Sequence, residues 1–424
     1  MRNKRLLAAL LLLTLGLSAC GTVPPAETTV TDPICTELAG ESLVLPPPNA
    51  DASFADNLMR LTVSDGNRMV SPYSAKLCLA LLANGARGET KQQILDMLQI
   101  ADLDAFNAEV KELLARYESY AGVMSLETAN SLWLNQSSFG GKGKFLVGYQ
   151  DAMQDFYAAE VREVTDANSV EEVNAWVNDK THEKIPSILS EEHRKFATAL
   201  VNAVYFKAAW AESFPEAATA NGEFYNLDGS IGTLPFMQKT DSFGYYEGDG
   251  VRAVQIDYGR AGENETYLAD ARYSFSMYVM LCDDPAATLD VDAFLTKNAP
   301  FARERVHVKL PKFEMEYSLA LRDILIALGM VDAFDGERAD LGAMMDLGAL
   351  DGNLYVSDAL QKTYVKLDEN GTEAAAVTAI LVKLTSAMKP TEPIEFTADK
   401  PFYFAIRDNT SGETLFVGRY ETAK

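Results

Sequence analysis

The order of secondary-structure patterns along one long, uninterrupted stretch constrains the fold most strongly. From Asp51 to Lys424 the composition is that of a globular chain and no second linker interrupts it. A stretch of about 370 residues can bury a large core, so we expect one large domain over residues 51–424. Helical periodicity is concentrated early in this stretch and strand-like runs late. Such segregation predicts an α+β fold rather than alternating βαβ units.

The individual elements are predicted from the spacing of apolar residues. Helices are expected at residues 54–61, 74–86, 90–98, 103–117, 145–157, 170–182 and 318–328. Strands are expected at residues 125–134, 197–206, 251–257, 274–281, 306–310, 354–367, 394–396, 402–407 and 414–417. Ser71 and Pro72 form a start signal for the second helix, because proline is tolerated in a first helical turn.

Residues 1–19 have the pattern of a lipoprotein signal peptide. Arg2, Lys4 and Arg5 precede an apolar run at residues 6–17, which is too short to span a bilayer comfortably. The run leads to Cys20, and this junction resembles the lipobox of bacterial lipoproteins. The resemblance implies that the Cys20 thiol accepts a diacylglyceryl group and that the protein is held at the extracellular face of the cell membrane or envelope. The alternative is an ordinary signal peptide with a chance cysteine.

Residues 20–50 are expected to be a lipidated cysteine followed by a tether. Six of the 16 prolines fall between residues 21 and 50, including the triplet at 46–48, and threonine-rich stretches lie between them. Such composition favours extended chain over a packed core.

The net charge restricts the binding partners of the protein, and the cysteine content restricts its metal sites and disulfides. A formal net charge of -24 argues against nucleic acid, which requires a basic face, and against lying flat on an anionic membrane. We therefore expect membrane contact only through the lipid. Cys35, Cys78 and Cys282 are an odd remainder without C-x-x-C spacing, so the sequence indicates neither a zinc site nor a disulfide framework. The last two sit in apolar runs, where core packing is expected.

A search for catalytic motifs finds no candidate. The three histidines, His182, His193 and His307, belong to no metalloprotease motif, and no nucleophile elbow, P-loop or dinucleotide fingerprint occurs. Counting carboxylates leaves a paired-carboxylate hydrolase open, but no spacing singles out a pair. The sequence therefore predicts no catalytic residue, no metal site and no cofactor.

Residues 371–384 have an unusual alternation. The residues at even-numbered positions, one parity of the run, are small or apolar throughout. The residues at odd-numbered positions, the other parity, include the two charges, Glu373 and Lys383. This alternation is typical of a half-buried strand. The following residues 385–399 hold two prolines and many polar side chains, as an accessible loop would. A buried helix or plain strand is the alternative, because alanine-rich runs favour helix.

Residues 368–376 closely resemble the reactive-loop hinge of inhibitory serpins, and further matches follow in the family's order. These lie at residues 70–74, 84–90, 202–210, 310–313, 325–329, 400–404 and 416–419. Together they cover almost all of the chain from Asp51. The resemblance implies an α+β serpin fold with about nine helices and three β-sheets, and with an exposed reactive loop above a five-stranded main sheet.

The resemblance also implies a function, that of a suicide-type protease inhibitor rather than an enzyme. A serine protease would cut the loop, form a covalent 1:1 complex with the monomeric inhibitor and be trapped when the loop inserts into the main sheet; cysteine proteases are an alternative target class. The native state would then be metastable. The hinge is assigned to Glu369, Gly371, Thr372, Glu373, Ala374, Ala375, Ala376 and Thr378. The breach and shutter of the sheet are assigned to Trp210, Asn202, Ser71, Ser74 and Gln361, the last standing where the family usually has a histidine.

The reactive bond is predicted less sharply than the hinge. Counting forward from Gly371 with the usual hinge length gives Thr385–Ser386, whereas counting back from Phe402 gives residues 387–390. Lys383, Leu384 and Met388 remain alternative cut sites, and the target protease is not readable from them. A non-inhibitory serpin-fold surface binding protein is the alternative function. The small inward-facing hinge residues argue against it, because bulk or charge there would stall insertion.

Overall fold

The computed structural model describes residues 45–120, 124–259, 274–349, 352–372 and 392–423. The predicted signal peptide, Cys20, Cys35 and nearly all of the tether therefore lie outside the described residues. The hinge from Glu373 onward and every candidate for the reactive bond also lie outside them.

The described residues contain eight α-helices, most of them in the first half of the chain. They are α1 (Phe54–Leu61), α2 (Pro72–Gly85), α3 (Gly88–Leu98), α4 (Leu103–Ser119), α5 (Val147–Tyr157), α6 (Ser169–Lys180), α7 (Val291–Asn298) and α8 (Arg322–Ala327). Ser71 caps α2 as expected, since its hydroxyl accepts from the Ser74 N–H and Pro72 begins the helix.

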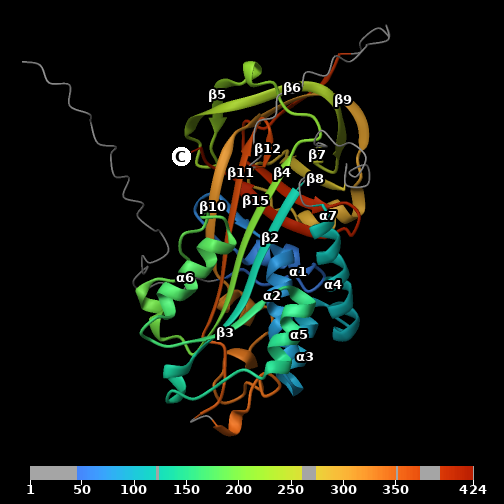
Figure 1. Cartoon of the computed structure of the whole chain (residues 1–424). Helices are drawn as coiled ribbons and strands as arrows, with labels where there is room; N and C mark the ends of the chain where they lie inside the picture. Colours follow the sequence, from blue (N-terminus) through green and yellow to red (C-terminus); the bar gives the residue numbers. More distant parts are fainter. Residues whose placement is uncertain (1–44, 121–123, 260–273, 350–351, 373–391, 424) are drawn as a thin grey trace, which may run out of the picture. The chain divides into compact units, whose positions relative to one another are not determined.

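The main sheet has the strand order β10-β11-β12-β4-β2-β3. Its strands are β10 (Phe313–Ala320), β11 (Asp358–Asp368), β12 (Gly371–Thr372), β4 (Thr198–Ala209), β2 (Met124–Asn135) and β3 (Glu160–Val164). Figure 1 shows the long strands β2, β4, β11 and β10 side by side. Because β12 has only two residues, the sheet consists of five longer strands with the start of a sixth between β11 and β4.

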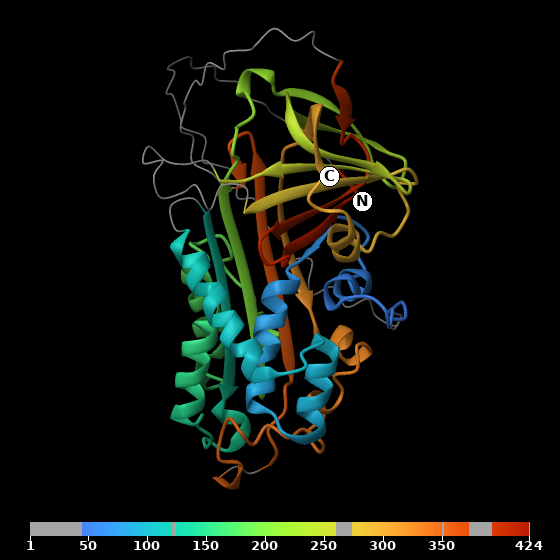
Figure 2. The same cartoon turned by 90° about the vertical axis from the view of Figure 1, so that its right-hand side faces the viewer.

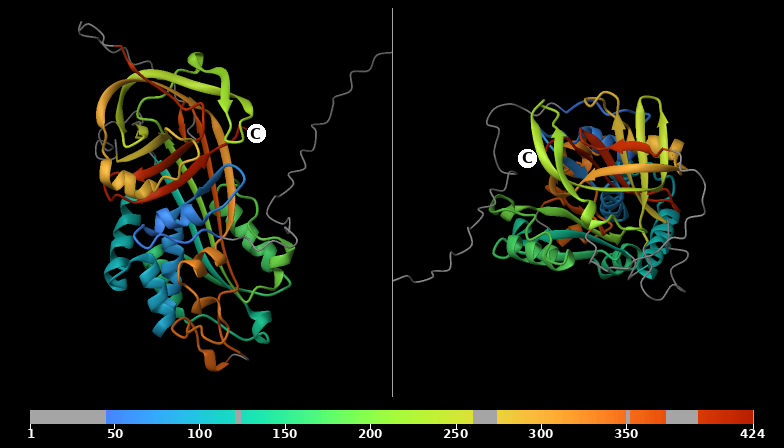
Figure 3. Two further views of the ribbon diagram at one scale, coloured as in Figure 1. Left: turned by 180° about the vertical axis from the view of Figure 1, so that it is seen from behind. Right: turned by 90° about the horizontal axis from the view of Figure 1, so that it is seen from above.

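Within the described ranges the second sheet has nine strands in the order β1-β15-β14-β8-β7-β6-β9-β13, with β5 paired to β6. They are β1 (Arg68–Val70), β5 (Ala220–Tyr225), β6 (Ile231–Gly248), β7 (Val251–Asp257), β8 (Phe275–Cys282), β9 (Ala302–Pro311), β13 (Ile394–Thr397), β14 (Phe402–Asp408) and β15 (Thr414–Tyr420). Figure 3 shows β6 arching across the top of the molecule. The three sheets implied by the resemblance appear as two hydrogen-bonded sheets, because the 18-residue β6 pairs with β5, β7 and β9 and joins two of them.

Several predicted boundaries are wrong. The helix expected at residues 318–328 begins only at Arg322, since Ser318 to Ala320 continue β10 and pair with β11. Strand β11 begins at Asp358 rather than at residue 354. The sequence prediction missed β1, β3, β5, β6, β10 and α7. The long β6 mixes exposed and buried residues irregularly and contains Pro235, so it has no clear period-2 signal.

The two faces of the main sheet are covered differently. Helix α6 packs on one face against β2, where Trp176 meets Trp133 edge to face, and its Val173 and Val177 belong to the same buried cluster as Tyr205 and Tyr364 of the sheet. Helix α2 contacts β2 and β4 on the other face. Figure 2 shows the long strands nearly edge-on, with helices beside them and the second sheet toward the upper right. Both Cys78 and Cys282 are buried free cysteines, as their apolar surroundings predict.

Candidate functional site

The candidate site is the seam between β11 and β4 in the main sheet. The two strands pair directly and in parallel from Asp358 opposite Ala199 to Tyr364 opposite Tyr205. Beyond this pairing they part, and β12 lies between their ends. Thr372 pairs with Leu367 of β11 and with Ala208 of β4, antiparallel to both. The first two residues of the predicted hinge strand are thus already part of the sheet (Figure 1).

Gly371 enters the sheet in a conformation and a space that favour glycine. Its φ is +148°, a region that L side chains rarely adopt. A Cβ built on it would lie 2.1 Å from the Ala208 carbonyl oxygen and 2.8 Å from the Ala209 Cα, both backbone atoms of β4. A side chain at this position would force the hinge out of the gap.

Thr372 is held at the end of the seam by a buried hydroxyl pair. Its side chain is fully buried, and its Oγ1 lies 2.6 Å from the Tyr258 hydroxyl. Tyr258 in turn stacks on Trp210, with ring centroids 4.5 Å apart and planes 11° apart. Burial raises the pKa of Tyr258, so its hydroxyl stays protonated and able to donate at neutral pH. The sequence prediction missed Tyr258, which has no partner close in sequence.

Trp210, the predicted breach tryptophan, ties the turn before the hinge to β4. Its indole N–H donates to the Asp368 carbonyl at 3.0 Å, and its backbone N–H donates to the Asn370 carbonyl at 2.9 Å. The tryptophan is fully buried. It therefore fixes the turn from which β12 starts.

Glu369 holds the same turn, between β11 and β12, through an ion pair and a hydrogen bond. Its carboxylate accepts from the Thr219 hydroxyl at 2.6 Å and forms an ion pair with Lys312 at 2.7 Å. Burial opposes the charged form, but the bonds from Lys312 and Thr219 outweigh this and lower the pKa of Glu369. A carboxyl whose folded-state pKa is lowered stabilises the folded state above its unfolded pKa, and the contribution is lost as pH falls through the folded-state value.

We expect Glu369→Gln to lower the free energy of unfolding at pH 7.5 by about 1.5 kcal/mol, since a hydrogen bond to a charged group is lost. The difference from the unchanged protein should shrink as pH falls below 4.5, the ordinary pKa of a glutamate, because protonation removes the same charge. Urea unfolding at pH 7.5 and at pH 4 measures both values. Glu216→Gln, at an exposed glutamate of the neighbouring 3-10 helix, is the control. A difference that does not change with pH would contradict the assignment.

Five buried polar side chains form a cluster on the seam, here called the shutter cluster: Ser71, Ser74, Asn130, Asn202 and Gln361. Gln361 and Asn202 face each other across β11 and β4 in the strand register, and the Gln361 amide donates to Asn202 Oδ1 at 2.6 Å. Asn202 donates onward to the Ser74 hydroxyl and to Asn130 Oδ1. All five are at most 1 % exposed.

Gln361 also joins the seam to the start of α2. Its Oε1 accepts the Ser71 backbone N–H at 2.9 Å, and its Nε2 donates to the Ser71 carbonyl at 2.9 Å. The Ser71 hydroxyl donates to the Leu415 carbonyl of β15 at 2.6 Å. None of the five side chains of the cluster titrates near neutral pH, so its hydrogen bonds do not depend on pH in that range.

The structure thus brings together the predicted shutter residues and, separately, Trp210 with Glu369, Gly371 and Thr372. Sequence reasoning missed Asn130 in the shutter cluster. An asparagine inside an otherwise strand-like run is a weak signal for such a buried polar residue, because a buried amide requires partners. The part of each residue in loop insertion stays a prediction.

Metal binding, membrane spanning and nucleophilic catalysis have little support among the described residues. They contain no group of three or more side chains that could hold a metal ion. They also contain no helix long and apolar enough to cross a membrane. The Ser190 hydroxyl lies 2.9 Å from His193 Nδ1, but the Ser190 backbone N–H donates to the same nitrogen. This pair caps the short 3-10 helix at Glu191–Lys195, so we read it as structural rather than as a nucleophile and base.

Comparison with known proteins gives one consistent result. A family model described as "Serpin (serine protease inhibitor)" matches residues 49–422. A serpin-like protein of Thermococcus kodakarensis, uncharacterised, is 32% identical over 385 residues, which are 89% of this chain and 85% of that protein. The native crystal structure of tengpin, a thermophilic serpin, matches with a TM-score of 0.74 and 28% identity over 88% of this chain and 93% of tengpin.

The fold is shared with proteins of other activity. Human thyroxine-binding globulin, complexed with thyroxine in its crystal structure, has a TM-score of 0.74 but only 21% identity, over 87% of this chain and 96% of its own. That likeness shows the fold alone.

Proposed function

The chain belongs to the serpin family, and from this premise we propose that it inhibits serine proteases by being cut in its reactive loop and inserting the cut loop between β11 and β4. The family supports a protease-inhibitor type of function in general. The observation that carries the specific mechanism is the position of β12. It lies between β11 and β4 and runs antiparallel to both, so a strand continuing from Thr372 would pass down the seam.

Insertion along the seam would replace weaker pairing with stronger pairing. It breaks seven parallel residue pairs between β11 and β4. In exchange, about a dozen inserted residues gain antiparallel hydrogen bonds on both sides, each contributing ~1 kcal/mol net. Burying the small apolar parity of residues 372–384 adds ~25 cal/mol per Å2. The sum is on the order of 10 kcal/mol, enough to deform a bound protease.

The contacts of the seam explain why the uncut protein would not insert its loop. The Gln361–Asn202 hydrogen bond and the rest of the shutter cluster close the seam in the middle of the sheet. On the opposite face, the segment after α6 lies against the last pair of the seam, since His182 meets the ring of Tyr205 edge to face and the Lys184 ammonium lies over the ring of Tyr364. Both sets of contacts must open before a strand can pass. They supply the barrier that keeps a metastable state in place.

We propose that the protein acts as a monomer, 1:1 with its protease, and that a lipid on Cys20 holds it at the extracellular face of the cell envelope. The order of charged, apolar and cysteine segments in residues 1–20 supports the anchor. The mass of the mature amino terminus, with or without a diacylglyceryl group on Cys20, tests it.

The test of the function uses protein beginning at Asp51, mixed with elastase-, subtilisin-, chymotrypsin- and trypsin-like proteases and a papain-like cysteine protease. We expect a complex that survives boiling in detergent with at least one of them. Mass spectrometry should find the new amino terminus after one of residues 383–388, which covers Thr385–Ser386 and its alternatives. Cleavage in this window by every protease without any complex would refute inhibition and favour the non-inhibitory binding protein.

A further inference from the structure

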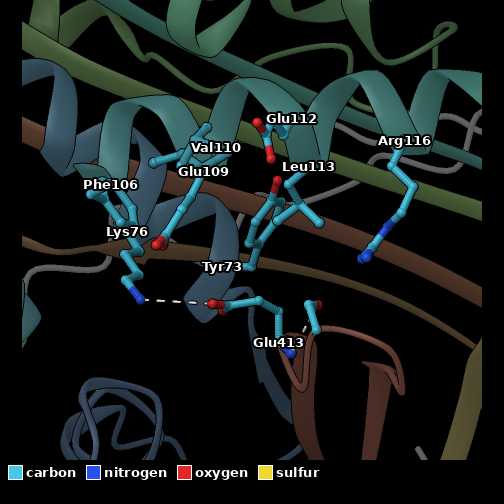
Figure 4. Close-up of a pocket in the computed structure, with 11 residues that line it drawn as sticks. Tyr73, Lys76, Phe106, Glu109, Val110, Glu112, Leu113, Arg116 and Glu413 are labelled. Atoms are coloured by element: carbon cyan, nitrogen blue, oxygen red, sulfur yellow. Dashed lines mark hydrogen bonds and ion pairs between the residues drawn. The ribbon is translucent and has the colours of Figure 1, made fainter. Parts of the chain in front are cut away.

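A cavity of about 410 Å3 lies between α2, α4 and the turn that joins β14 to β15, outside the site described above. Its volume falls within the range of small-molecule sites. Phe106, Val110 and Leu113 of α4 form an apolar wall, and Tyr73 and Lys76 of α2 face it (Figure 4). The cavity therefore combines apolar surface with a few polar groups, as ligand sites do.

Tyr73 presents an unused hydroxyl to this cavity. The side chain is only 2 % exposed, and its hydroxyl has no hydrogen-bond partner among the described residues. Figure 4 shows the hydroxyl directed toward α4. A buried hydroxyl without a hydrogen-bond partner destabilises the folded state. A ligand group that bonds to it from inside the cavity therefore supplies a hydrogen bond that the protein alone does not make.

The charges around the cavity favour a cation. Its positive groups are occupied, because Arg116 pairs with the buried Asp408, and the Lys76 ammonium lies 3.8 Å from the Glu413 carboxylate and 5.2 Å from the centre of the Phe106 ring. Glu109 and Glu112, by contrast, line the cavity without an ion-pair partner in the part of the chain that the structure describes.

The charged groups around the Tyr73 hydroxyl also favour a positive ligand group. Burial raises the pKa of Tyr73, and Glu413 and Asp408 raise it further, with Arg116 opposing them. Nearby carboxylates that disfavour a phenolate also attract a positive group to the same place.

We propose that this cavity is a binding site for a small organic cation, a protonated amine on an aromatic or aliphatic body. The ammonium group donates to the Tyr73 hydroxyl oxygen and to the carboxylate of Glu109 or Glu112. The body packs against Phe106 and Leu113. The site does not depend on the proposed inhibitory function, and its test does not require a protease.

The test uses the full chain and three probes of similar size: 2-phenylethylamine, 2-phenylethanol and phenylacetate. We expect ligand-observed NMR to show the amine binding at least tenfold more tightly than the other two. Tyr73→Phe removes only the hydroxyl and leaves the ring in its apolar contacts. It should weaken amine binding about tenfold without lowering the thermal midpoint.

Two further variants place the site on α4. Replacing Glu109 and Glu112 together with glutamine should weaken amine binding about fivefold, whereas Glu118→Gln, on the same helix but outside the cavity, should leave it unchanged. Three results would overturn the proposal: no binding of the amine, equal binding of the carboxylate, or an affinity that Tyr73→Phe does not change. In each of these cases an ordered water is the better partner for the Tyr73 hydroxyl.

Discussion

Replacing Thr372 with arginine is expected to abolish the covalent protease complex while the loop is still cut. Thr372 is fully buried between β11 and β4, where its hydroxyl meets Tyr258. A guanidinium group in that place would replace a small hydroxyl beside the neutral side chains of Tyr258 and Trp210, and burying it there would cost several kcal/mol. The arginine would hold the start of the hinge out of the sheet, so insertion of the cut loop would be slower than hydrolysis of the acyl-enzyme, and the protease would be released active.

The measurement is the ratio of complex to cleaved inhibitor after reaction with the protease that the unchanged protein traps. We expect this ratio to fall at least 100-fold, which corresponds to about 2.7 kcal/mol in favour of hydrolysis over insertion. Ala375→Arg is the matched control, because the alternation of the sequence assigns Ala375 to the opposite parity of the hinge. The control should retain most of the complex. Equal loss in both variants would show that charge anywhere in the hinge, rather than burial at position 372, prevents trapping.

The sequence predicted that Thr372 faces inward because strand alternation is a local property, whereas the alternation from Glu373 onward lies outside the described residues and stays a prediction. Thr372 is small and lies on the inward parity, and the structure buries it. The start of α2 was equally readable, because Ser71 and Pro72 act within one turn. Both predictions depend on neighbours in the chain and not on the packing of distant segments.

The contacts that complete the site come from segments far apart in sequence. Tyr258 meets Thr372 across 114 residues, and Asn202 meets Ser74 across 128. No spacing rule connects such pairs; only the fold does. Trp210 and Gln361 were identified through the family resemblance, whereas Tyr258 and Asn130 had no such guide.

The sequence did not predict β6, the strand that joins two expected sheets into the second sheet, and the reason is different. Strand β6 is 18 residues long, includes Pro235 and changes partner along its length. Each half meets a different environment, so its burial pattern has no single period. The stretch from Ser318 to Ala320 shows the opposite error: its apolar spacing suits the helix that follows, but pairing with β11 holds it as a strand.

Asn202→Ala is expected to destabilise the native protein more than any other change in the shutter cluster. Asn202 uses both ends of its amide, since Oδ1 accepts from Gln361 while Nδ2 donates to Ser74 and Asn130. Its removal leaves these buried groups short of partners at a depth that water does not reach. The loss of several coupled bonds should lower the free energy of unfolding by about 3 kcal/mol.

Urea unfolding followed by tryptophan fluorescence measures this value. Asn221→Ala, at an exposed asparagine of β5, should change the free energy by less than about 0.5 kcal/mol. A loss of the same small size for Asn202→Ala would show that the cluster does not hold the seam.

The same variant separates stability from readiness to insert. The Gln361–Asn202 bond crosses the seam, so any strand that passes between β11 and β4 must break it. Removing it raises the free energy of the closed sheet, and the barrier to opening should fall. On incubation at neutral pH, Asn202→Ala should therefore convert faster than the unchanged protein to a form that resists urea and no longer traps protease. If the variant is less stable but converts no faster, the cluster stabilises the fold without controlling the seam.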